Sequence, residues 1–162
     1  MLLCNREIGT NRPLFAIAGP CVIESEALAL SVAEHLADVA RKLGLLLIFK
    51  SSFDKANRSS DRSFRGLGMD EGLLILKKVR SETIVPVLTD AHEPAQDAPV
   101  AEVVAVLRTS AFLAGQTGFI AAVAGEGEPA NIKKAESIAL RPFRQFAGEC
   151  YGHLSCAAST GI

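Results

Sequence analysis

The chain of 162 residues predicts an α/β fold in which helices cover a parallel sheet. Three observations predict it. Short apolar runs that are typical of strands alternate with longer segments of helical periodicity. Most of these runs are continuously apolar, as in strands that are buried on both faces of a parallel sheet. Polar or charged residues follow the ends of the runs, where parallel sheets commonly place their functional side chains.

The first strand is predicted at residues 14–18, where an apolar run is closed by Gly19 and Pro20. Ser25 is expected to cap the next helix, whose apolar residues recur at helical spacing until Gly44 stops it. Residues 45–49 then predict a second buried strand. This strand leads directly into a polar, cationic loop.

Three further strands are predicted at residues 84–89, 110–113 and 131–133, the last two being weaker or shorter. Pro86 lies at the entry of the first of these, because proline cannot donate a hydrogen bond inside a sheet. The intervening helices are expected to begin at Asp70, Asp97 and Thr117. The helix from Asp97 would extend to Val106.

Residues with chemical potential lie where the predicted strands end, namely Cys21, Lys50, Asp90 and Lys133. A parallel barrel would bring these ends to one face, whereas a doubly wound sheet would place them along a crevice. No glycine-rich dinucleotide loop follows the first strand, and Gly66-Leu67-Gly68 lacks the third glycine of that motif. The pattern therefore favours the barrel.

The composition is that of an ordinary globular protein, with 49% hydrophobic residues, 22% charged residues and a net charge of −1. It offers no basic excess for nucleic acid and no apolar run of membrane-spanning length. The four cysteines have no close CxxC spacing and the start does not resemble a signal peptide. We therefore expect reduced thiols and a cytoplasmic location.

The loop at residues 49–60 places Lys50, Lys55 and Arg58 among small serine and asparagine side chains. Lysine offers a compact charge, arginine a fork that matches phosphate oxygens, and the small polar residues add hydrogen bonds. The loop is therefore a candidate site for small, highly charged anions such as phosphates. A solvated surface loop with incidental cations is the alternative.

Several motifs occur together in one order: residues 18–25 (AGPCVIES), 49–60 (FKSSFDKANRSS), 63–66 (SFRG), 89–93 (TDAHE) and 131–134 (NIKK). Over residues 14–134 the chain resembles the 3-deoxy-D-manno-octulosonate 8-phosphate synthases, also called the 2-dehydro-3-deoxyphosphooctonate aldolase family. That resemblance implies a (β/α)8 TIM barrel. The related aldoheptulosonate-phosphate synthases share a Gly-Pro-Cys turn, but have a Lys-Pro-Arg-Thr type motif in place of Lys-Ala-Asn-Arg-Ser-Ser.

The resemblance implies condensation of phosphoenolpyruvate with arabinose 5-phosphate in the synthesis of a lipopolysaccharide sugar. Phosphoenolpyruvate would be surrounded by three lysines, Lys50, Lys55 and Lys133. Arabinose 5-phosphate would be held by Asn57, Arg58 and Ser59. The resemblance also implies that Lys55 polarises the sugar aldehyde or protonates its developing oxyanion, and that Asp90 belongs to the active-site face.

Cys21 resembles the residue that marks the metal-dependent branch of the family, where the thiolate binds a divalent ion together with a His, a Glu and an Asp. By this resemblance Cys21 is a candidate metal ligand, and the other three ligands would come from parts of the family sequence beyond residue 134. Without the family, a small buried thiol at a strand end is the simpler interpretation of Cys21.

The pattern departs from the family at three places. One is Ala135-Glu136-Ser137, which stands where the family has Gly or Pro followed by Gln-Phe. The family has an Arg-Gln-Thr-Asp run whose arginine, by resemblance, reaches the sugar phosphate of a neighbouring subunit, whereas this chain has Gly115-Gln116-Thr117-Gly118. After Lys134 the motifs stop, although a closed barrel typically has about 250 residues. We therefore expect residues 1–134 to be the first five βα units of a synthase domain, and residues 135–162 to be a divergent tail.

Three functions follow from the sequence. The chain is expected to act as a synthase of this family, as a homo-oligomer if folded. Alternatively, it is a truncated, inactive relative that retains partial binding of phosphate ligands. A third possibility is a 3-deoxy-arabino-heptulosonate 7-phosphate synthase.

Overall fold

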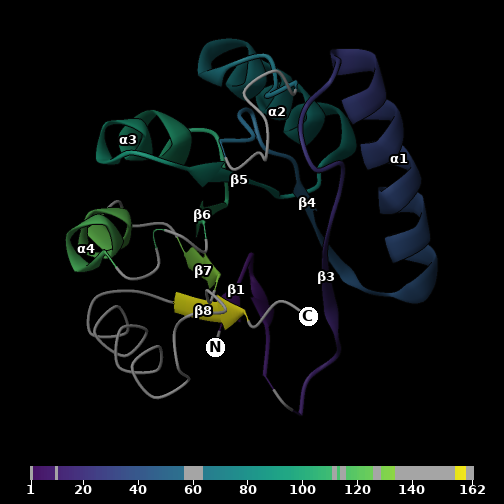
Figure 1. Cartoon of the computed structure of the whole chain (residues 1–162). Helices are drawn as coiled ribbons and strands as arrows, with labels where there is room; N and C mark the ends of the chain where they lie inside the picture. The colour runs from purple at the N-terminus through teal and green to yellow at the C-terminus, as the bar shows by residue number, and fades with distance from the viewer. Residues whose placement is uncertain are drawn as a thin grey trace. The chain divides into compact units, whose positions relative to one another are not determined.

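The computed structural model describes residues 2–9, 11–56, 64–110, 113, 116–125, 129–133 and 156–159 (Figure 1). The chain divides into two compact units, Met1–Thr89 and Asp90–Ile162. The division falls inside one strand, β5 (Val87–Ala91). Each unit contains parallel strands that are joined by helices.

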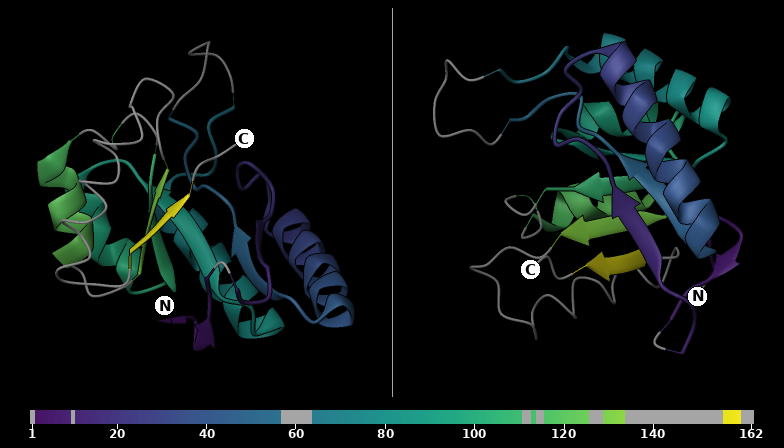
Figure 2. Two further views of the ribbon diagram at one scale, coloured as in Figure 1. Left: turned by 90° about the horizontal axis from the view of Figure 1, so that it is seen from below. Right: turned by 90° about the vertical axis from the view of Figure 1, so that its right-hand side faces the viewer.

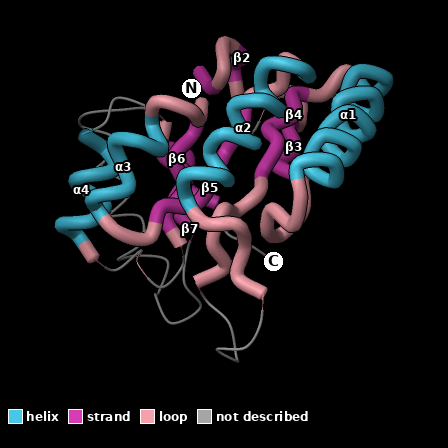
Figure 3. Tube along the Cα trace, turned by 90° about the horizontal axis from the view of Figure 1, so that it is seen from above, coloured by secondary structure: helices cyan, strands magenta, loops and turns pink. Residues whose placement is uncertain are grey.

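The first unit begins with a short antiparallel hairpin, β1 (Leu2–Leu3) and β2 (Arg6–Glu7). Two βα units follow, made of β3 (Phe15–Ala18), α1 (Glu26–Leu43), β4 (Leu46–Lys50) and α2 (Met69–Thr83). Strand β4 pairs in parallel with both β3 and β5. Helix α1 packs against β4 and against α2 (Figure 3).

Helix α1 forms where the sequence predicts it. The Ser25 hydroxyl accepts a hydrogen bond from the Leu28 amide at 3.2 Å, and Gly44 ends the helix in the left-handed region at φ 66°. The buried face consists of alanines, Ala29, Ala33, Ala37 and Ala40. Small side chains let the helix lie close to its neighbours. Leu43, at the end of the helix, is exposed.

Replacing Ser25 with alanine is expected to destabilise the protein by about 1 kcal/mol, because the Leu28 amide loses its capping acceptor. Urea unfolding followed by circular dichroism measures this loss. Ser31, on the exposed side of α1, is the matched control. Its replacement with alanine should change the free energy of unfolding by no more than about 0.5 kcal/mol. Equal effects at both positions would contradict a capping role for Ser25.

Two element boundaries of the first unit differ from the sequence prediction. The N-cap of α2 is Gly68, so Asp70 lies in the first turn of the helix and does not cap it. Ile84 ends α2 in the left-handed region at φ 58°, and the third strand therefore begins at Val87, not at residue 84. Pro86 lies before the strand, where its carbonyl accepts from the Phe49 amide at 2.8 Å. Proline has no N–H to donate into the sheet, which explains the later start of the strand.

Strand β3 is only half-buried, although the sequence predicts a buried strand, and Leu14 before it is 80% exposed. Within the described residues β3 pairs with β4 alone, so its other edge is not covered by a strand. Strand β5, by contrast, is buried along its whole length. The core of this unit is therefore centred on β4, β5 and α2.

The second unit contains α3 (Pro94–Ala101), β6 (Val106–Thr109), α4 (Thr117–Gly125), β7 (Ala130–Lys133) and β8 (Cys156–Ser159). Strand β7 pairs in parallel with β6 and with β8, and the three arrows run in the same direction in Figure 2. Helices α3 and α4 contact each other and β6. The predictions for α4 and for the strand at residues 131–133 are confirmed. Strand β8 lies in the tail, where no strand was expected.

The predictions for α3 and β6 are wrong in their bounds. Helix α3 begins at Pro94, because proline suits the first helical position, and Asp97 is buried inside it. The following strand occupies residues 106–109, not 110–113, so Val106 belongs to the strand and not to the helix. Arg108 interrupts the apolar run in the sequence, yet it is accommodated because Asp90 pairs with it.

The α/β fold class is confirmed, with parallel strands in chain order and helices between them in both units. This is the arrangement of successive units of a (β/α)8 barrel. None of the helices in the described part of the chain is long and apolar enough to cross a membrane. The predicted boundary between residues 134 and 135 stays a prediction.

Candidate anion-binding site

The candidate site lies in the first unit, where the segments that follow β3 and β4 run side by side. Val22 and Ser52 form a parallel bridge, and the Ile23 amide donates to the Ser52 carbonyl at 2.9 Å. This pairing extends the contact between the two strands beyond their ends. It therefore places Cys21 next to the beginning of the cationic loop.

Gly19 makes this close approach possible. Its φ is 154°, and a Cβ atom at this position would lie 2.1 Å from the Lys50 carbonyl oxygen. Real Cβ atoms do not approach a backbone oxygen so closely, and backbone cannot move aside as a flexible side chain can. The Gly-Pro-Cys turn is thus required for the two chain segments to meet.

Lys50 and Lys55 converge on Cys21. The Lys55 ammonium donates to the Cys21 Sγ at 2.6 Å. The Lys50 ammonium donates to the Cys21 carbonyl at 3.3 Å and to the Ser52 hydroxyl at 2.6 Å. Two positive charges therefore meet at one exposed cysteine at the ends of β3 and β4. Such a pair of charges favours an anionic ligand.

The loop that carries Lys55 is closed by a second set of bonds. Arg65 donates two hydrogen bonds to the Asp54 carboxylate, Nε to Oδ1 at 2.9 Å and Nη2 to Oδ2 at 2.6 Å. The hydrogen bond and the negative charge of Asp54 raise the pKa of Arg65 above its usual value. The Lys55 amide also donates to the Arg65 carbonyl at 2.6 Å. Asp54 and Arg65 thus join the two ends of the loop that carries Lys55.

Replacing Asp54 with alanine is expected to loosen this loop, because the bidentate grip is what holds its two arms together. We expect the Lys55 amide to exchange its hydrogen about tenfold faster, while the amides of α1 keep their rates. Hydrogen–deuterium exchange measures both in one sample. Asp38, whose ion pair with Arg41 lies on the surface of α1, is the matched control. A loop amide that responds equally to Asp38→Ala would contradict the role of Asp54.

Phe53 anchors the same loop in the core. Its side chain is fully buried, and its carbonyl accepts from the Gly68 amide at 3.3 Å. Two glycines lie directly against it: a Cβ at Gly66 would lie 2.2 Å from the Phe53 oxygen, and one at Gly72 would lie 2.4 Å from the Phe53 Cβ. The cationic loop thus begins on a rigid support that is shared with α2.

Three of the predicted ligands of the sugar phosphate, Asn57, Arg58 and Ser59, lie outside the described residues, as does Gly115. The structure therefore brings together Cys21, Lys50 and Lys55 from the predicted set. Their roles as ligands of particular substrates stay predictions.

The second unit holds the other two predicted site residues. Asp90 is nearly buried near the end of β5, and Lys133 is half-buried at the end of β7. The Asp90 Oδ1 lies 3.5 Å from the Nε of Arg108 on β6. Sequence reasoning missed Arg108. The available signal was a cation inside an apolar run, but the predicted strand begins four residues after the observed one.

A metal ion would require more donors than the described residues assemble. No group of three or more His, Cys, Asp or Glu side chains comes together in the described ranges. In addition, the sulfur of Cys21 faces the ammonium of Lys55, which a cation would have to displace. The described residues alone therefore do not fit a metal centre.

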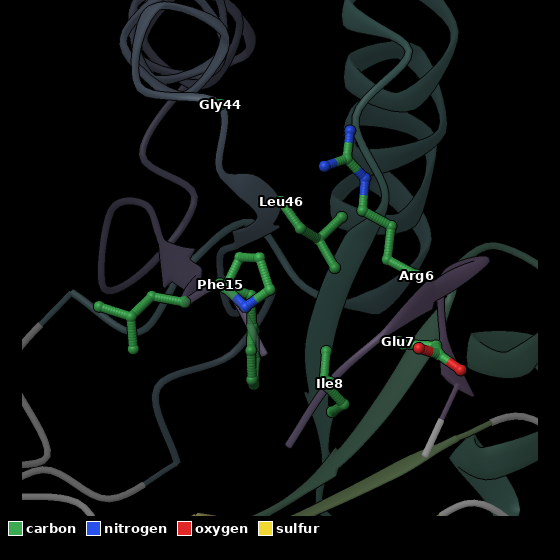
Figure 4. Close-up of a pocket in the computed structure, with 8 residues that line it drawn as sticks. Arg6, Glu7, Ile8, Phe15, Gly44 and Leu46 are labelled. Carbon is green, nitrogen blue, oxygen red and sulfur yellow. The ribbon is translucent and has the colours of Figure 1, made fainter. Parts of the chain in front are cut away.

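A separate pocket of about 280 Å³ lies against the hairpin and the beginning of β3 and β4 (Figure 4). Its lining is mainly apolar, including Phe15 and Leu46, with Arg6 and Glu7 pointing in different directions. Glu7 is paired with Arg12 at 2.7 Å. This pocket lacks converging cations, so it is not the candidate anion site.

Comparison with known proteins agrees with the motifs. A curated 2-dehydro-3-deoxyphosphooctonate aldolase from Acidithiobacillus ferrooxidans is 60% identical over 139 residues, which cover 86% of this chain and 50% of that protein. Proteins of the same name from Ralstonia pickettii and Methylobacillus flagellatus are 58% and 54% identical, over 86% and 90% of this chain and 49% and 52% of their own length. The chain thus spans about half the length of these relatives.

The model of the DAHP synthetase I family matches residues 4–158. The match includes the whole of strands β3 to β7, and it extends past Lys134, where the recognisable motifs stop. It therefore covers nearly the whole chain. This chain belongs to the DAHP synthetase I family.

Proposed function

We propose that the protein condenses phosphoenolpyruvate with arabinose 5-phosphate to give 3-deoxy-D-manno-octulosonate 8-phosphate and inorganic phosphate. One observation carries this proposal: the ammonium groups of Lys50 and Lys55 converge at Cys21, at the ends of two parallel strands. Strand ends are where barrel enzymes bind their substrates. The aldolase names of the relatives support the choice of reaction.

The chemistry suits two lysines at one point. Phosphoenolpyruvate carries a phosphate and a carboxylate, and compact ammonium groups neutralise both without fixing one orientation. In the reaction, C3 of the enol bonds to the aldehyde carbon of the sugar. Water then adds at C2 and phosphate leaves. Lys55 would donate a proton to the aldehyde oxygen as negative charge develops on it.

The remaining predicted residues enter the proposal with separate roles. Lys133 would add a third positive charge for phosphoenolpyruvate. Asn57, Arg58 and Ser59 would hold the phosphate and hydroxyl groups of arabinose 5-phosphate. Asp90 would lie on the active-site face, with Arg108 orienting its carboxylate through their ion pair.

We also propose that the protein acts in the cytoplasm and as a homo-oligomer. The cysteine pattern supports the first, because reduced thiols are typical of that compartment. The second is supported by β3, which pairs with β4 alone among the described strands, since an unpaired strand edge is normally covered. Sedimentation velocity on the purified chain tests the oligomer, and a monomer at all concentrations would refute it.

A divalent metal at Cys21 is a further proposal, in which the remaining donors would come from outside the described residues. We expect Cd²⁺ to give a thiolate charge-transfer absorbance that Cys21→Ser abolishes and Cys4→Ser retains. Lys55→Met should tighten Cd²⁺ binding several-fold, because the competing ammonium is removed. An absorbance that persists in Cys21→Ser would exclude Cys21 as the ligand.

The purified chain tests the reaction directly. Phosphate release from phosphoenolpyruvate is measured with arabinose 5-phosphate, with erythrose 4-phosphate and with no sugar. The proposal expects release with the five-carbon sugar alone. Release only with erythrose 4-phosphate would instead identify a heptulosonate synthase. No release, with phosphoenolpyruvate still binding by calorimetry, would identify an inactive relative and overturn the proposed reaction.

A further inference from the structure

The Lys55 ammonium contacts the sulfur of Cys21 directly, and substrate binding does not require this contact. The Lys55 nitrogen lies 2.6 Å from the Cys21 sulfur, and the cysteine is exposed. The two residues are 34 positions apart in the chain and are brought together by the pairing of the segments after β3 and β4. A nucleophilic sulfur and an amine are thus held in contact where a small oxidant in solution can reach the sulfur.

The neighbouring lysine is engaged differently. The Lys50 ammonium donates to the Cys21 carbonyl and to the Ser52 hydroxyl. Lys55, whose own amide is tied to Arg65, approaches the sulfur itself. The structure therefore shows Lys55 as an amine in direct contact with the sulfur, and this contact is the basis of the proposal.

We propose that Cys21 and Lys55 form a reversible covalent cross-link when the protein is exposed to a peroxide. The pair would then be a site of oxidative modification in addition to being part of the candidate anion-binding site. The cross-link is a sulfur–nitrogen bond, a sulfenamide, between the Cys21 Sγ and the Lys55 Nζ. Sulfenic acids are known to condense with nitrogen nucleophiles in this way.

The reaction has two steps, and each is balanced. First, the thiol attacks hydrogen peroxide and the O–O bond breaks. The products are the sulfenic acid and one water. The sulfur is oxidised by two electrons, and the peroxide is reduced by the same two. Second, the Lys55 ammonium gives one proton to solvent and its lone pair attacks the sulfur. The S–O bond then breaks. The leaving hydroxide takes a second proton from the nitrogen and departs as water. Two equivalents of a small thiol reverse the cross-link, returning cysteine and lysine and forming a disulfide of the reductant.

The consequence for the enzyme rests on the proposed function, whereas the cross-link itself does not. A sulfenamide removes the positive charge of Lys55 and fixes its side chain on Cys21. It would therefore stop both phosphate binding and proton donation by Lys55. It also protects the sulfur from irreversible oxidation to the sulfinic acid. The pair would act as a switch that thiols reset.

Peptide mass spectrometry after peroxide treatment tests the proposal without relying on activity. The whole purified chain is treated with hydrogen peroxide in the presence of a metal chelator, then alkylated and digested. We expect one cross-linked species that joins the peptides of Cys21 and Lys55, with two hydrogens lost. Dithiothreitol should return both peptides to their original masses.

Three variants sharpen this test. Lys55→Met should abolish the cross-link and let Cys21 proceed to the sulfinic acid, whereas Lys50→Met and Cys4→Ser should retain the cross-link. A sulfenic acid on Cys21 that dimedone traps, with no Cys21–Lys55 species in the wild type, would overturn the proposal. A cross-link to Lys50 in place of Lys55 would overturn it as well. Because these outcomes are read from peptides, they stand whether or not the chain releases phosphate.

Discussion

Replacing Gly19 with alanine is expected to destabilise the protein by about 3 kcal/mol, since the new methyl group cannot be accommodated without a backbone shift. The added Cβ would lie 2.1 Å from the Lys50 carbonyl oxygen and 3.2 Å from the Lys50 amide nitrogen. A φ of 154° adds backbone strain for any residue with a side chain. The substitution would therefore push apart the segments that hold Cys21 and Lys50.

Urea unfolding measures this loss, and Gly9→Ala is the matched control. A Cβ at Gly9 would meet only the flexible Arg12 side chain, at 3.9 Å. The control should therefore change the free energy of unfolding by less than about 0.5 kcal/mol. If Gly19→Ala were as stable as Gly9→Ala, the close approach of the two segments would be wrong.

Replacing Lys55 with methionine is expected to lower phosphate release in the presence of arabinose 5-phosphate by about 100-fold or more, the usual effect of losing one charged donor at a reacting oxygen. Methionine retains much of the length of the side chain and removes the ammonium. The neighbouring Lys50 remains in place, so phosphoenolpyruvate should still bind, but more weakly. Steady-state kinetics and calorimetry measure the two effects separately.

Lys77→Met is the matched control for Lys55, because Lys77 is exposed on α2 and makes no contact with Cys21. It should leave turnover and binding unchanged within about twofold. Unfolding of each variant in urea excludes a loss of fold as the cause. If Lys55→Met turned over at the rate of Lys77→Met, Lys55 would have no chemical role.

Local patterns in the sequence were sufficient for the elements that carry their own start and stop signals. Helix α1 has a serine cap and a terminal glycine, and both operate as expected. The helix at residues 117–125 and the strand at 130–133 were likewise recognisable. The strand boundary near residue 110 was not, because Arg108 lies inside the strand and pairs with Asp90, which comes from another strand.

In the candidate site too, the motifs are visible in the sequence, whereas the contacts between them are visible only in the structure. The cationic loop and the Gly-Pro-Cys turn were visible as motifs, and their residue types already indicated an anionic ligand. Nothing local showed that Lys55 would reach the sulfur of Cys21, while Lys50 would bind its carbonyl. Nor did the sequence alone show that Asp54 pairs with Arg65 through two hydrogen bonds.

By itself, the sequence determined the α/β class and the family motifs and predicted the kind of ligand, because periodicity, caps and charged loops are properties of short segments. Only the tertiary structure decided which side chains meet. Contacts such as that between Cys21 and Lys55 depend on strand register and on glycines that allow two backbones to touch. These are set by packing over long separations in the chain, which no local pattern encodes.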